Sequence, residues 1–146
     1  MLSDEYFELP PPKSTGFEYF NTAWLKSKLS SFGKAAPAAV DVQATLAELS
    51  ARTIATAILK NAAEVNEVLV CGGGVHNTDL LQRLTTNLAG SSVESTESRG
   101  LHPDCVEAAA FAWLAKCRLE GKPGNLPEAT GASRPELLGA VYMCVS

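Results

Sequence analysis

The sequence predicts an α/β fold in which short parallel strands alternate with helices. The first indication is residues 68–71, an apolar run without alternation, which is typical of a strand covered on both faces in a parallel sheet. The second is helical periodicity over about 40–62 and again directly after this run. The third is a weaker strand near 92–95, which the intervening helix would join to the first strand as a parallel neighbour.

Capping residues and periodicity predict two helices before the first strand. Thr15 and Glu18 have the spacing of a capping box, so the first helix is expected near 16–29. The second helix is expected near 40–62. Its apolar face is expected to consist of Val42, Leu46, Leu49, Thr53 and Ala57.

Three helices are predicted after the first strand. Asn77 is a favoured N-cap residue, and the helix that it starts should bury Leu80, Leu81, Leu84 and Leu88. The next helix lies within 102–120, stops at Gly121, and is expected to bury Val106, Ala110, Trp113 and Cys117. The capping-box spacing of Ser133 and Glu136 predicts a short final helix.

The chain is expected to form one unit preceded by a short strap. Residues 1–13 include three consecutive prolines, which favour an extended backbone and cannot continue a helix, so this segment is interpreted as an extended linker or strap. Residues 14–146 are short enough for a single domain. Two strands cannot cover so much helix, however, which indicates that the chain is part of a larger domain.

Composition and charge exclude several classes of protein. The 146 residues are 46% hydrophobic and carry a net charge of −4, and no Lys/Arg-rich block offers the basic surface that nucleic acid requires. No apolar run reaches the length needed to cross a membrane, and the acidic, proline-containing start is unlike a signal peptide. The cysteines at positions 71, 105, 117 and 144 are expected to be small buried residues in a reducing cytoplasm. With two histidines and no CxxC pair, no metal site is expected.

Three consecutive glycines, Gly72, Gly73 and Gly74, lie between the first strand and the helix that begins at Asn77. A helix amino end presents unpaired N–H groups and the positive end of the helix dipole. Glycines at such a point can adopt positive φ and let a phosphate, or the face of a base, lie against the backbone. A tight turn that binds nothing is the alternative, but three glycines are more than it needs. The pattern therefore favours ligand binding.

Known nucleotide motifs restrict the type of ligand. A P-loop is excluded because no Lys-Ser or Lys-Thr pair closes the glycine segment. Gly72 and Gly74, with Glu94 about 20 residues further on, partly match the dinucleotide fingerprint. The third position of that fingerprint is Asn77, however, and the order of elements departs from a Rossmann unit. NAD binding is therefore the less favoured alternative.

Four segments together resemble one known family. They are "LPPPKSTGFEYFNTAWL", "VLVCGGGVHNTDLLQRL", "PDCVEAAAFAWLA" and "GKPGNLPEATGA". In this order they resemble the C-terminal part of anhydro-N-acetylmuramic acid kinase, a sugar kinase of the actin/hexokinase/Hsp70-like ATPase superfamily. The resemblance covers residues 6 to about 142. It implies that residues 14–146 belong to a nucleotide-binding, actin-like (RNase H-like) lobe whose sheet is incomplete in this chain.

The resemblance also implies a reaction. Kinases of this family cleave the 1,6-anhydro ring of the sugar with water while ATP phosphorylates the 6-position, which yields N-acetylmuramic acid 6-phosphate in peptidoglycan recycling. ATP with Mg²⁺ and the amino sugar are the expected ligands, the cytoplasm is the expected location, and homodimer formation is left open. The family's catalytic aspartate and first phosphate loop lie in its N-terminal half. This chain is therefore expected to hold no catalytic residue and to be inactive alone.

Individual site residues carry over from the motifs of the family. Gly72 to Gly74 and Asn77 match the loop on the adenosine side of the nucleotide. Glu107 matches an acidic position near the sugar, where it would hydrogen-bond substrate hydroxyls or orient the water. Asp104 and Glu107 also have capping-box spacing, so a purely structural role at a helix start is the alternative.

Other positions are matched less directly or depart from the family. Lys13 and Ser14 match a segment expected near the cleft between the lobes, with a solvated lysine as the alternative. Phe17 stands where the family commonly has arginine, so an ionic contact from that position is lost. Cys105 stands where aspartate or alanine is common.

Three classes of protein stay open from the sequence. The first is a kinase fragment in which two lobes jointly position the phosphoryl group. The second is a nucleotide-binding module without catalysis. The third is an interaction protein whose exposed sheet edge pairs with another chain.

Overall fold

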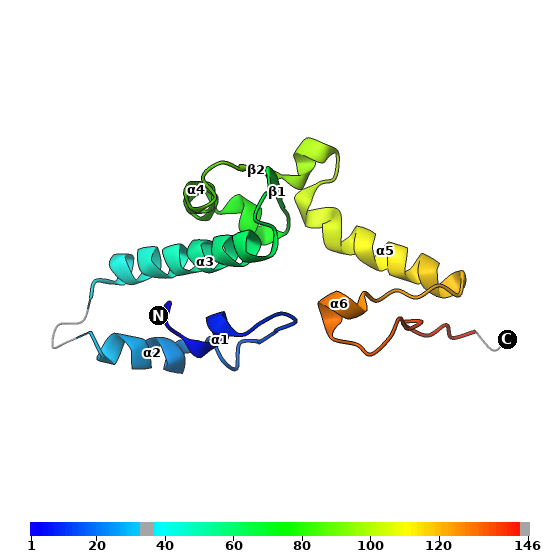
Figure 1. Cartoon of the computed structure of the whole chain (residues 1–146), viewed down its shortest axis with the longest axis horizontal. Coiled ribbons are helices and arrows are strands. Elements are labelled where there is room, and N and C mark those ends of the chain that lie inside the picture. Colours follow the sequence, from blue (N-terminus) through cyan, green and yellow to red (C-terminus); the bar gives the residue numbers. More distant parts are fainter. Residues whose placement is uncertain (33–36, 144–146) are drawn as a thin grey trace.

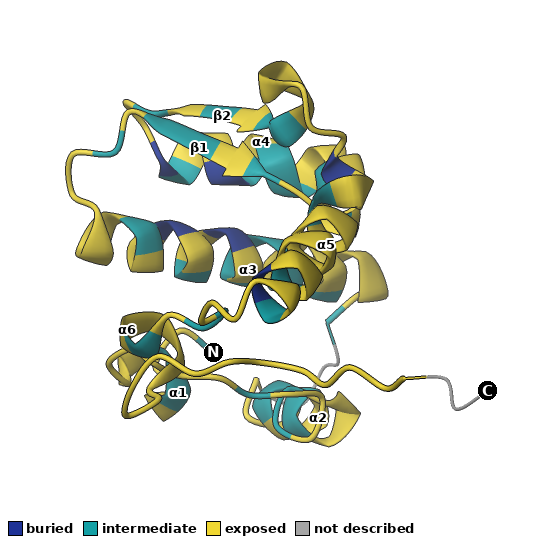
Figure 2. Ribbon diagram, turned by 90° about the vertical axis from the view of Figure 1, so that its right-hand side faces the viewer, coloured by how far each residue is buried: buried dark blue, intermediate teal, exposed yellow. Residues whose placement is uncertain are grey.

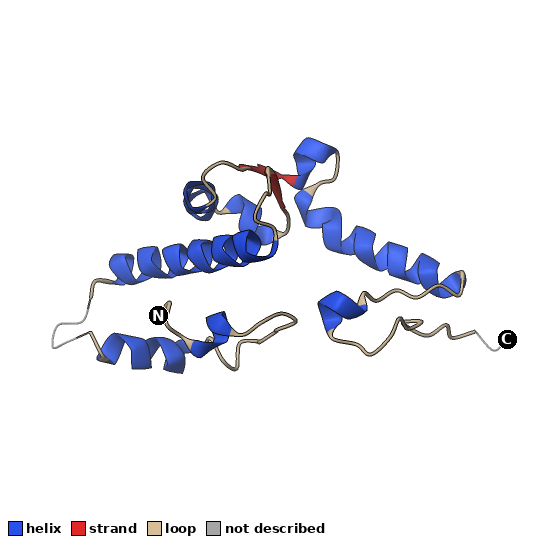
Figure 3. Ribbon diagram, in the orientation of Figure 1, coloured by secondary structure: helices blue, strands red, loops and turns tan. Residues whose placement is uncertain are grey.

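The computed structural model describes residues 1–32 and 37–143 of the chain. Its helices and strands, in chain order, are α1 (Glu5–Glu8), α2 (Thr22–Ser30), α3 (Ala39–Asn61), β1 (Glu67–Val70), α4 (Thr78–Asn87), β2 (Ser92–Ser95), α5 (Val106–Leu119) and α6 (Pro127–Thr130). Short 3₁₀ turns occupy Gly73–His76, Thr96–Arg99 and Pro103–Cys105 (Figure 3). The fold is therefore α/β, as predicted.

The two strands form a parallel sheet. β1 pairs with β2 from Glu67 opposite Ser92 to Val70 opposite Ser95. Between them the chain crosses over through α4, as a parallel pair requires. Figure 1 shows α3, α4 and the strands gathered together, with α5 leading away from them toward α6. The predicted parallel pair is confirmed, and β1 begins and ends one residue earlier than expected.

The core lies between α3, α4 and one face of the sheet. Ala55, Leu84 and Leu88 are its buried residues, and Leu88 is only 1% exposed. Partly buried residues that pack against them are Ile58, Val68, Val70 and Val93. Figure 2 shows buried residues on α3 and on α4. The leucine stripe predicted for α4 is confirmed, because Leu80 and Leu81 are half-buried beside the two buried leucines.

The predicted apolar face of α3 is only partly correct. Ala57 is exposed, whereas the fully buried positions of the helix are Ala51 and Ala55. Alanine leaves room for a neighbouring helix to approach, so α4 packs on the small residues. The larger residues of the predicted stripe, from Val42 to Thr53, are half-buried instead.

One face of the sheet has no cover from the described part of the chain. Leu69, at the centre of β1, is 38% exposed. The prediction that β1 is covered on both faces is therefore not met within residues 1–32 and 37–143. A parallel strand of this composition is normally buried on both sides, so the open face is consistent with a chain that is part of a larger sheet.

The predicted buried face of α5 is wrong for this chain. Cys117 is buried, but Ala110 and Trp113 are exposed and Val106 is half-buried. The helix is apolar over most of its circumference, and Phe111 on another side is 66% exposed. Periodicity located an apolar helix correctly, but burial depends on neighbours that the described residues do not provide.

Residues 1–13 are not wholly an extended strap, which corrects the prediction. They contain α1, and Asp4 before it is buried. The Asp4 carboxylate accepts hydrogen bonds from Trp24 Nε1 at 2.9 Å and from the Tyr19 hydroxyl at 2.7 Å, and it pairs with Lys28 Nζ at 3.0 Å. The donors lie on or near α2, so this one carboxylate ties the first residues to that helix.

The first long helix begins later than predicted. α2 starts at Thr22, where Asn21 Oδ1 accepts hydrogen bonds from the N–H groups of Ala23 and Trp24 at 2.8 and 2.9 Å. The expected capping box at Thr15 does not form, because Glu18 accepts a hydrogen bond from the Gly16 N–H in a local turn instead. Such side-chain contacts with a nearby backbone compete with helix formation.

The C-terminal residues form loops with one short helix. α5 stops as predicted, with Gly121 at φ 67° and the Lys122 N–H donating to the Cys117 carbonyl at 2.9 Å. The helix predicted from Ser133 is absent from the described residues, and α6 forms earlier. The Glu136 N–H donates to Asn125 Oδ1 at 2.5 Å, so a contact between two loops replaces the expected cap.

Candidate functional site

The glycine loop, residues 72–76, follows directly on the carboxyl end of β1. Gly72 comes two residues after the strand, the Gly73–His76 turn follows, and α4 begins after Asn77. The Asn77 backbone is extended, and its Oδ1 accepts a hydrogen bond from the Leu80 N–H at 3.1 Å. Both predictions for this segment are confirmed: Asn77 caps α4, and the glycines lie outside a continuous α-helix.

The three glycines differ in what the backbone requires of them. Gly72 has φ 71° and ψ −173°, a conformation that side chains rarely permit. Gly73 and Gly74 do not share the positive φ, so of the three glycines Gly72 alone uses the conformation that the sequence allows for all of them. A Cβ at Gly73 would meet no described atom within 4 Å, and one at Gly74 would only touch Leu80 Cδ2 at 4.0 Å. Neither conformation nor packing within the described residues explains these two glycines.

The loop offers backbone donors to a ligand. Gly73 and Gly74 begin the 3₁₀ turn, and the first N–H groups of a helical segment have no partner inside it. The amino end of α4 follows immediately, with the positive end of its dipole. A flat or anionic group can therefore approach this backbone without meeting a side chain.

A second loop is attached to the glycine loop. The Gly72 N–H donates to the Pro103 carbonyl at 3.0 Å, and His76 Nε2 lies 3.1 Å from a carboxylate oxygen of Asp104. The Pro103–Cys105 turn leads directly into α5, so this contact places the start of α5 beside the start of α4. Both helices thus begin at the carboxyl edge of the parallel sheet, where α/β proteins commonly bind ligands.

Sequence reasoning missed the contact of His76 with Asp104, because no periodicity relates two loop residues 28 positions apart. The capping box that was the structural alternative for Asp104 and Glu107 does not form among the described residues. The Asp104 carboxylate faces His76, and its backbone N–H donates to His102 Nδ1 at 3.3 Å. Glu107 lies exposed in the first turn of α5, and no ion pair of its carboxylate is found within the described residues. That carboxylate is thus accessible to a ligand.

Lys13 is exposed, as the alternative of a solvated lysine expects, and it also makes local contacts. Its ammonium donates to the carbonyls of Tyr6 and Phe7 at 2.9 and 3.0 Å, which ends α1. Ser14 and Phe17 are exposed.

The expectation that the cysteines are buried holds only for Cys117. Cys71 and Cys105, next to the two loops of the site, are exposed. Cys144 lies outside the described residues. The strand end and the start of α5 are open in this chain, which explains why these two side chains have no cover.

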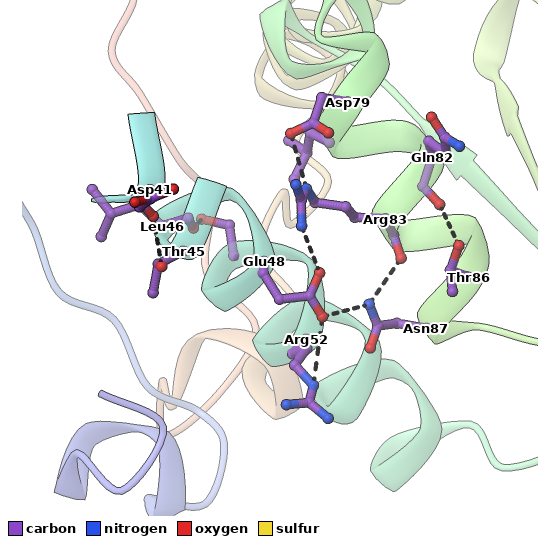
Figure 4. A network of polar contacts seen from close by, with 12 residues as sticks. Asp41, Thr45, Leu46, Glu48, Arg52, Asp79, Gln82, Arg83, Thr86 and Asn87 are labelled. Carbon is purple, nitrogen blue, oxygen red and sulfur yellow. Dashed lines mark hydrogen bonds and ion pairs between the residues drawn. The ribbon is translucent and has the colours of Figure 1, made fainter. Parts of the chain in front are cut away.

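Polar contacts hold α4, and with it the glycine loop, against α3 (Figure 4). Arg83 lies between Asp79, at 2.9 Å from its Nε, and Glu48, at 3.1 Å from its Nη1. Asn87 Nδ2 donates to the other oxygen of Glu48 at 3.3 Å, and Arg52 approaches that oxygen to 3.6 Å. The hydrogen bonds from Arg83 and Asn87 lower the pKa of Glu48, and those to Asp79 and Glu48 raise the pKa of Arg83.

Residues 1–32 and 37–143 contain neither a membrane-spanning helix nor a cluster of metal ligands. No helix there is long and apolar enough to cross a membrane. No three side chains of histidine, cysteine, aspartate or glutamate gather there as metal ligands would.

Comparison with known proteins identifies the family. The family model described as anhydro-N-acetylmuramic acid kinase matches residues 1–144. A kinase of that name from Xanthomonas campestris pv. campestris is 53% identical over 142 residues, which cover 97% of this chain and 37% of the relative. Those from Coxiella burnetii and Xylella fastidiosa are 49% and 48% identical, with 97% of this chain and 37% and 36% of the relatives covered.

The chain thus spans little more than a third of the length of the curated relatives that it matches. Its own length, in contrast, is matched almost completely, both by the family model and by these relatives. On this agreement, the chain belongs to the anhydro-N-acetylmuramic acid kinase family.

Proposed function

We propose that this chain is the nucleotide-side, C-terminal part of an ATP-dependent sugar kinase. The proposed reaction converts 1,6-anhydro-N-acetylmuramic acid, ATP and water to N-acetylmuramic acid 6-phosphate in peptidoglycan recycling. One observation carries the proposal. Gly73 and Gly74 have ordinary backbone angles and open space around them, and a ligand lying against this backbone would account for two glycines there. The names of the relatives supply the substrate class.

The residues of the loop fit the adenosine side of ATP. A base or ribose lying on Gly73 and Gly74 would meet no side chain, and Asn77 fixes the start of α4 beside it. ATP supplies the phosphoryl group. The contribution of this chain is to bind and orient the nucleotide.

Glu107 is the proposed sugar contact. Its carboxylate is exposed in the first turn of α5, and the Pro103–Cys105 turn joins this helix end to the glycine loop. A carboxylate at this position can accept hydrogen bonds from sugar hydroxyls or orient the attacking water. The nucleotide and the sugar would then lie on neighbouring loops of one sheet edge.

The remaining machinery is proposed to lie in the part of the kinase beyond this chain. Phosphoryl transfer needs a base at the attacking oxygen and a clamp on the γ-phosphate, and the chain holds no phosphate loop. The described residues also hold no cluster of metal ligands, so Mg²⁺ would be held by the phosphates of ATP and by residues outside the chain. The chain alone is therefore proposed to be inactive, within an actin-like lobe that works in the ATP-containing cytoplasm.

Binding of ATP by the isolated chain tests the proposal most directly. Gly73→Val should weaken ATP binding by about 2–3 kcal/mol without loss of helicity, because the new side chain occupies the surface that the nucleotide would contact. Isothermal titration calorimetry and circular dichroism measure the two quantities. Ala89→Val, at an exposed position of ordinary φ between α4 and β2, is the control for adding side-chain bulk elsewhere. Equal ATP binding by Gly73→Val and the parent would contradict the site.

Catalysis is tested in a chimera in which this chain replaces the matching segment of the Xanthomonas campestris relative. ADP release that depends on the anhydro-sugar is expected from the chimera and not from the chain alone. Phosphorylation of the anhydro-sugar by the chain alone would refute the proposal that the catalytic residues lie outside it. ATP binding without turnover in the chimera would favour a nucleotide-binding module, and light scattering on the chain alone tests homodimer formation.

The NAD-binding alternative has little support. Glu94 lies on β2, paired with Leu69, and β1 follows the long helix α3 instead of opening a Rossmann unit. Titration of the chain with NAD in the same calorimetric experiment compares its affinity for NAD with its affinity for ATP. Binding of NAD in preference to ATP would reverse the assignment.

A further inference from the structure

Two polar side chains without a role in the proposed reaction connect the glycine loop to the start of α5. His76 Nε2 lies 3.1 and 3.2 Å from the two carboxylate oxygens of Asp104. Beside this pair, the Gly72 N–H donates to the Pro103 carbonyl at 3.0 Å. Two elements that are far apart in the sequence are therefore joined at both ends of the loop, at Gly72 and at His76.

Each partner of this pair is held by its own surroundings. Asp104 follows the buried Pro103, and its N–H donates to His102 Nδ1. His76 ends the 3₁₀ turn and is followed directly by Asn77, which caps α4. Because the segments that carry both side chains are held by these hydrogen bonds, the contact between His76 and Asp104 sets the separation of the loop from α5.

The pair contributes little to the stability of the fold. The His76 side chain is 62% exposed and that of Asp104 is 50% exposed. Ion pairs and hydrogen bonds this open to water add little to folding. Their consequence is geometric, since they select one arrangement of two loops that are otherwise joined through a single backbone hydrogen bond.

We propose that His76 and Asp104 are positioning residues that hold the glycine loop against the amino end of α5. The inference rests on the proposed function, in which the loop contacts the nucleotide and Glu107 contacts the sugar. The pair touches neither ligand and acts by keeping the two binding loops at the distance that transfer requires. Misplacement of reacting groups by about 1 Å can cost on the order of 10²-fold in rate, so a weak contact at this point has a measurable effect.

The test uses the chimera with the Xanthomonas campestris relative. His76→Ala, Asp104→Ala and the double variant are compared with the parent chimera in kcat and in KM for ATP and for the sugar. Each single variant is expected to raise KM for ATP and to lower kcat, with a combined loss of about tenfold in kcat/KM. The double variant should lose no more than either single one, since both remove the same contact. His76→Gln, which keeps a donor, should recover part of the loss.

A matched control separates this effect from the removal of any surface charge. Lys122, after the end of α5, forms an exposed ion pair with Glu120 at 2.8 Å, and Lys122→Ala should leave all three constants unchanged. Asp104→Leu, which keeps about the size of the side chain but cannot accept a hydrogen bond, replaces Asp104→Ala if that variant does not fold by circular dichroism.

Two results would overturn the positioning role: constants equal to those of the parent chimera, or single losses that simply add in the double variant. A parent chimera that neither binds ATP nor turns over the sugar would instead refute the proposed function, and this inference with it. The parent and the variants thus distinguish the two failures.

Discussion

α4 and α5 begin at adjoining loops, but they differ in how the chain surrounds them. α4 carries its leucines on one side, and Leu84 and Leu88 are buried against α3 and the sheet. α5 is apolar on several sides, and its Phe111 and Trp113 are largely exposed. Neighbours on one side are enough to bury the apolar stripe of a helix such as α4. A helix that is apolar around most of its circumference needs neighbours on several sides to be buried. The difference indicates that the environment of α4 is complete in this chain and that of α5 is not.

Truncation of a core leucine should produce the largest effect on stability. Leu88→Ala removes a side chain packed against Ala55 and the sheet, so it should lower the free energy of unfolding by about 2–5 kcal/mol. Phe111→Ala, a larger truncation on α5, should change it by less than about 0.5 kcal/mol in the isolated chain. Urea unfolding measures both. Comparable losses would show that α5 is packed after all and would remove the contrast between the two helices.

Loss of the buried carboxylate near α2 should produce the next largest effect. Asp4→Asn replaces a charged acceptor of the Trp24 and Tyr19 donors by a neutral one, so the expected loss is about 2 kcal/mol in urea unfolding. The hydrogen-bond partners of Asp4 belong to this chain, whereas the described residues leave much of the apolar surface of α5 uncovered. A neutral result would mean that residues 1–32 are as weakly held as α5.

The same carboxylate makes the stability depend on pH. Hydrogen bonds from Trp24 and Tyr19 hold the pKa of Asp4 well below its usual 3.8, and the Asp4 hydrogen bond raises the pKa of Tyr19 to about 12. Since the folded-state pKa of Asp4 lies below the unfolded value, its stabilisation is complete well above pH 3.8 and is lost as the pH falls below it. The deficit of Asp4→Asn relative to the parent should therefore shrink in acid. A deficit that does not change between pH 7 and pH 3 would contradict this account.

Loss of the polar contacts between α3 and α4 should have the smallest effect on stability. Arg83→Ala removes the contacts with Asp79 and Glu48, which are partly open to solvent, so the expected fall in Tm is on the order of 2 °C. The effect should become smaller in 1 M salt, which screens such pairs. Lys116→Ala, which removes the exposed pair with Glu120 on α5, is the matched control and should leave Tm unchanged. A fall as large as that of Leu88→Ala would mean that polar contacts, rather than the leucines, join the two helices.

Most of the fold near the site is predictable from the sequence, and the wrong helix caps arise from reliance on residue spacing alone. Asn77 was recognised as a cap because a strong cap residue, a glycine turn and a leucine stripe coincide there. The capping-box spacings at Thr15 and Ser133 proved wrong, since the same spacing also fits turns, as the hydrogen bond between Glu18 and Gly16 illustrates. Of the candidate site residues, the glycines and Asn77 lie together, and Glu107 lies in the first turn of α5, near the loop. The contact of Asp104 with His76 has no signal in the residue spacing.

The sequence by itself determined the order of the elements from α2 to α5, the loop between β1 and α4, and the likeness to the kinase family. These features depend on neighbouring residues, so periodicity, caps and glycines reveal them. Only the tertiary structure decided that Asp4 is buried between Trp24 and Tyr19 and that His76 meets Asp104. These contacts join residues 15–28 positions apart, and their formation depends on how strands and helices pack in space, which no local pattern specifies.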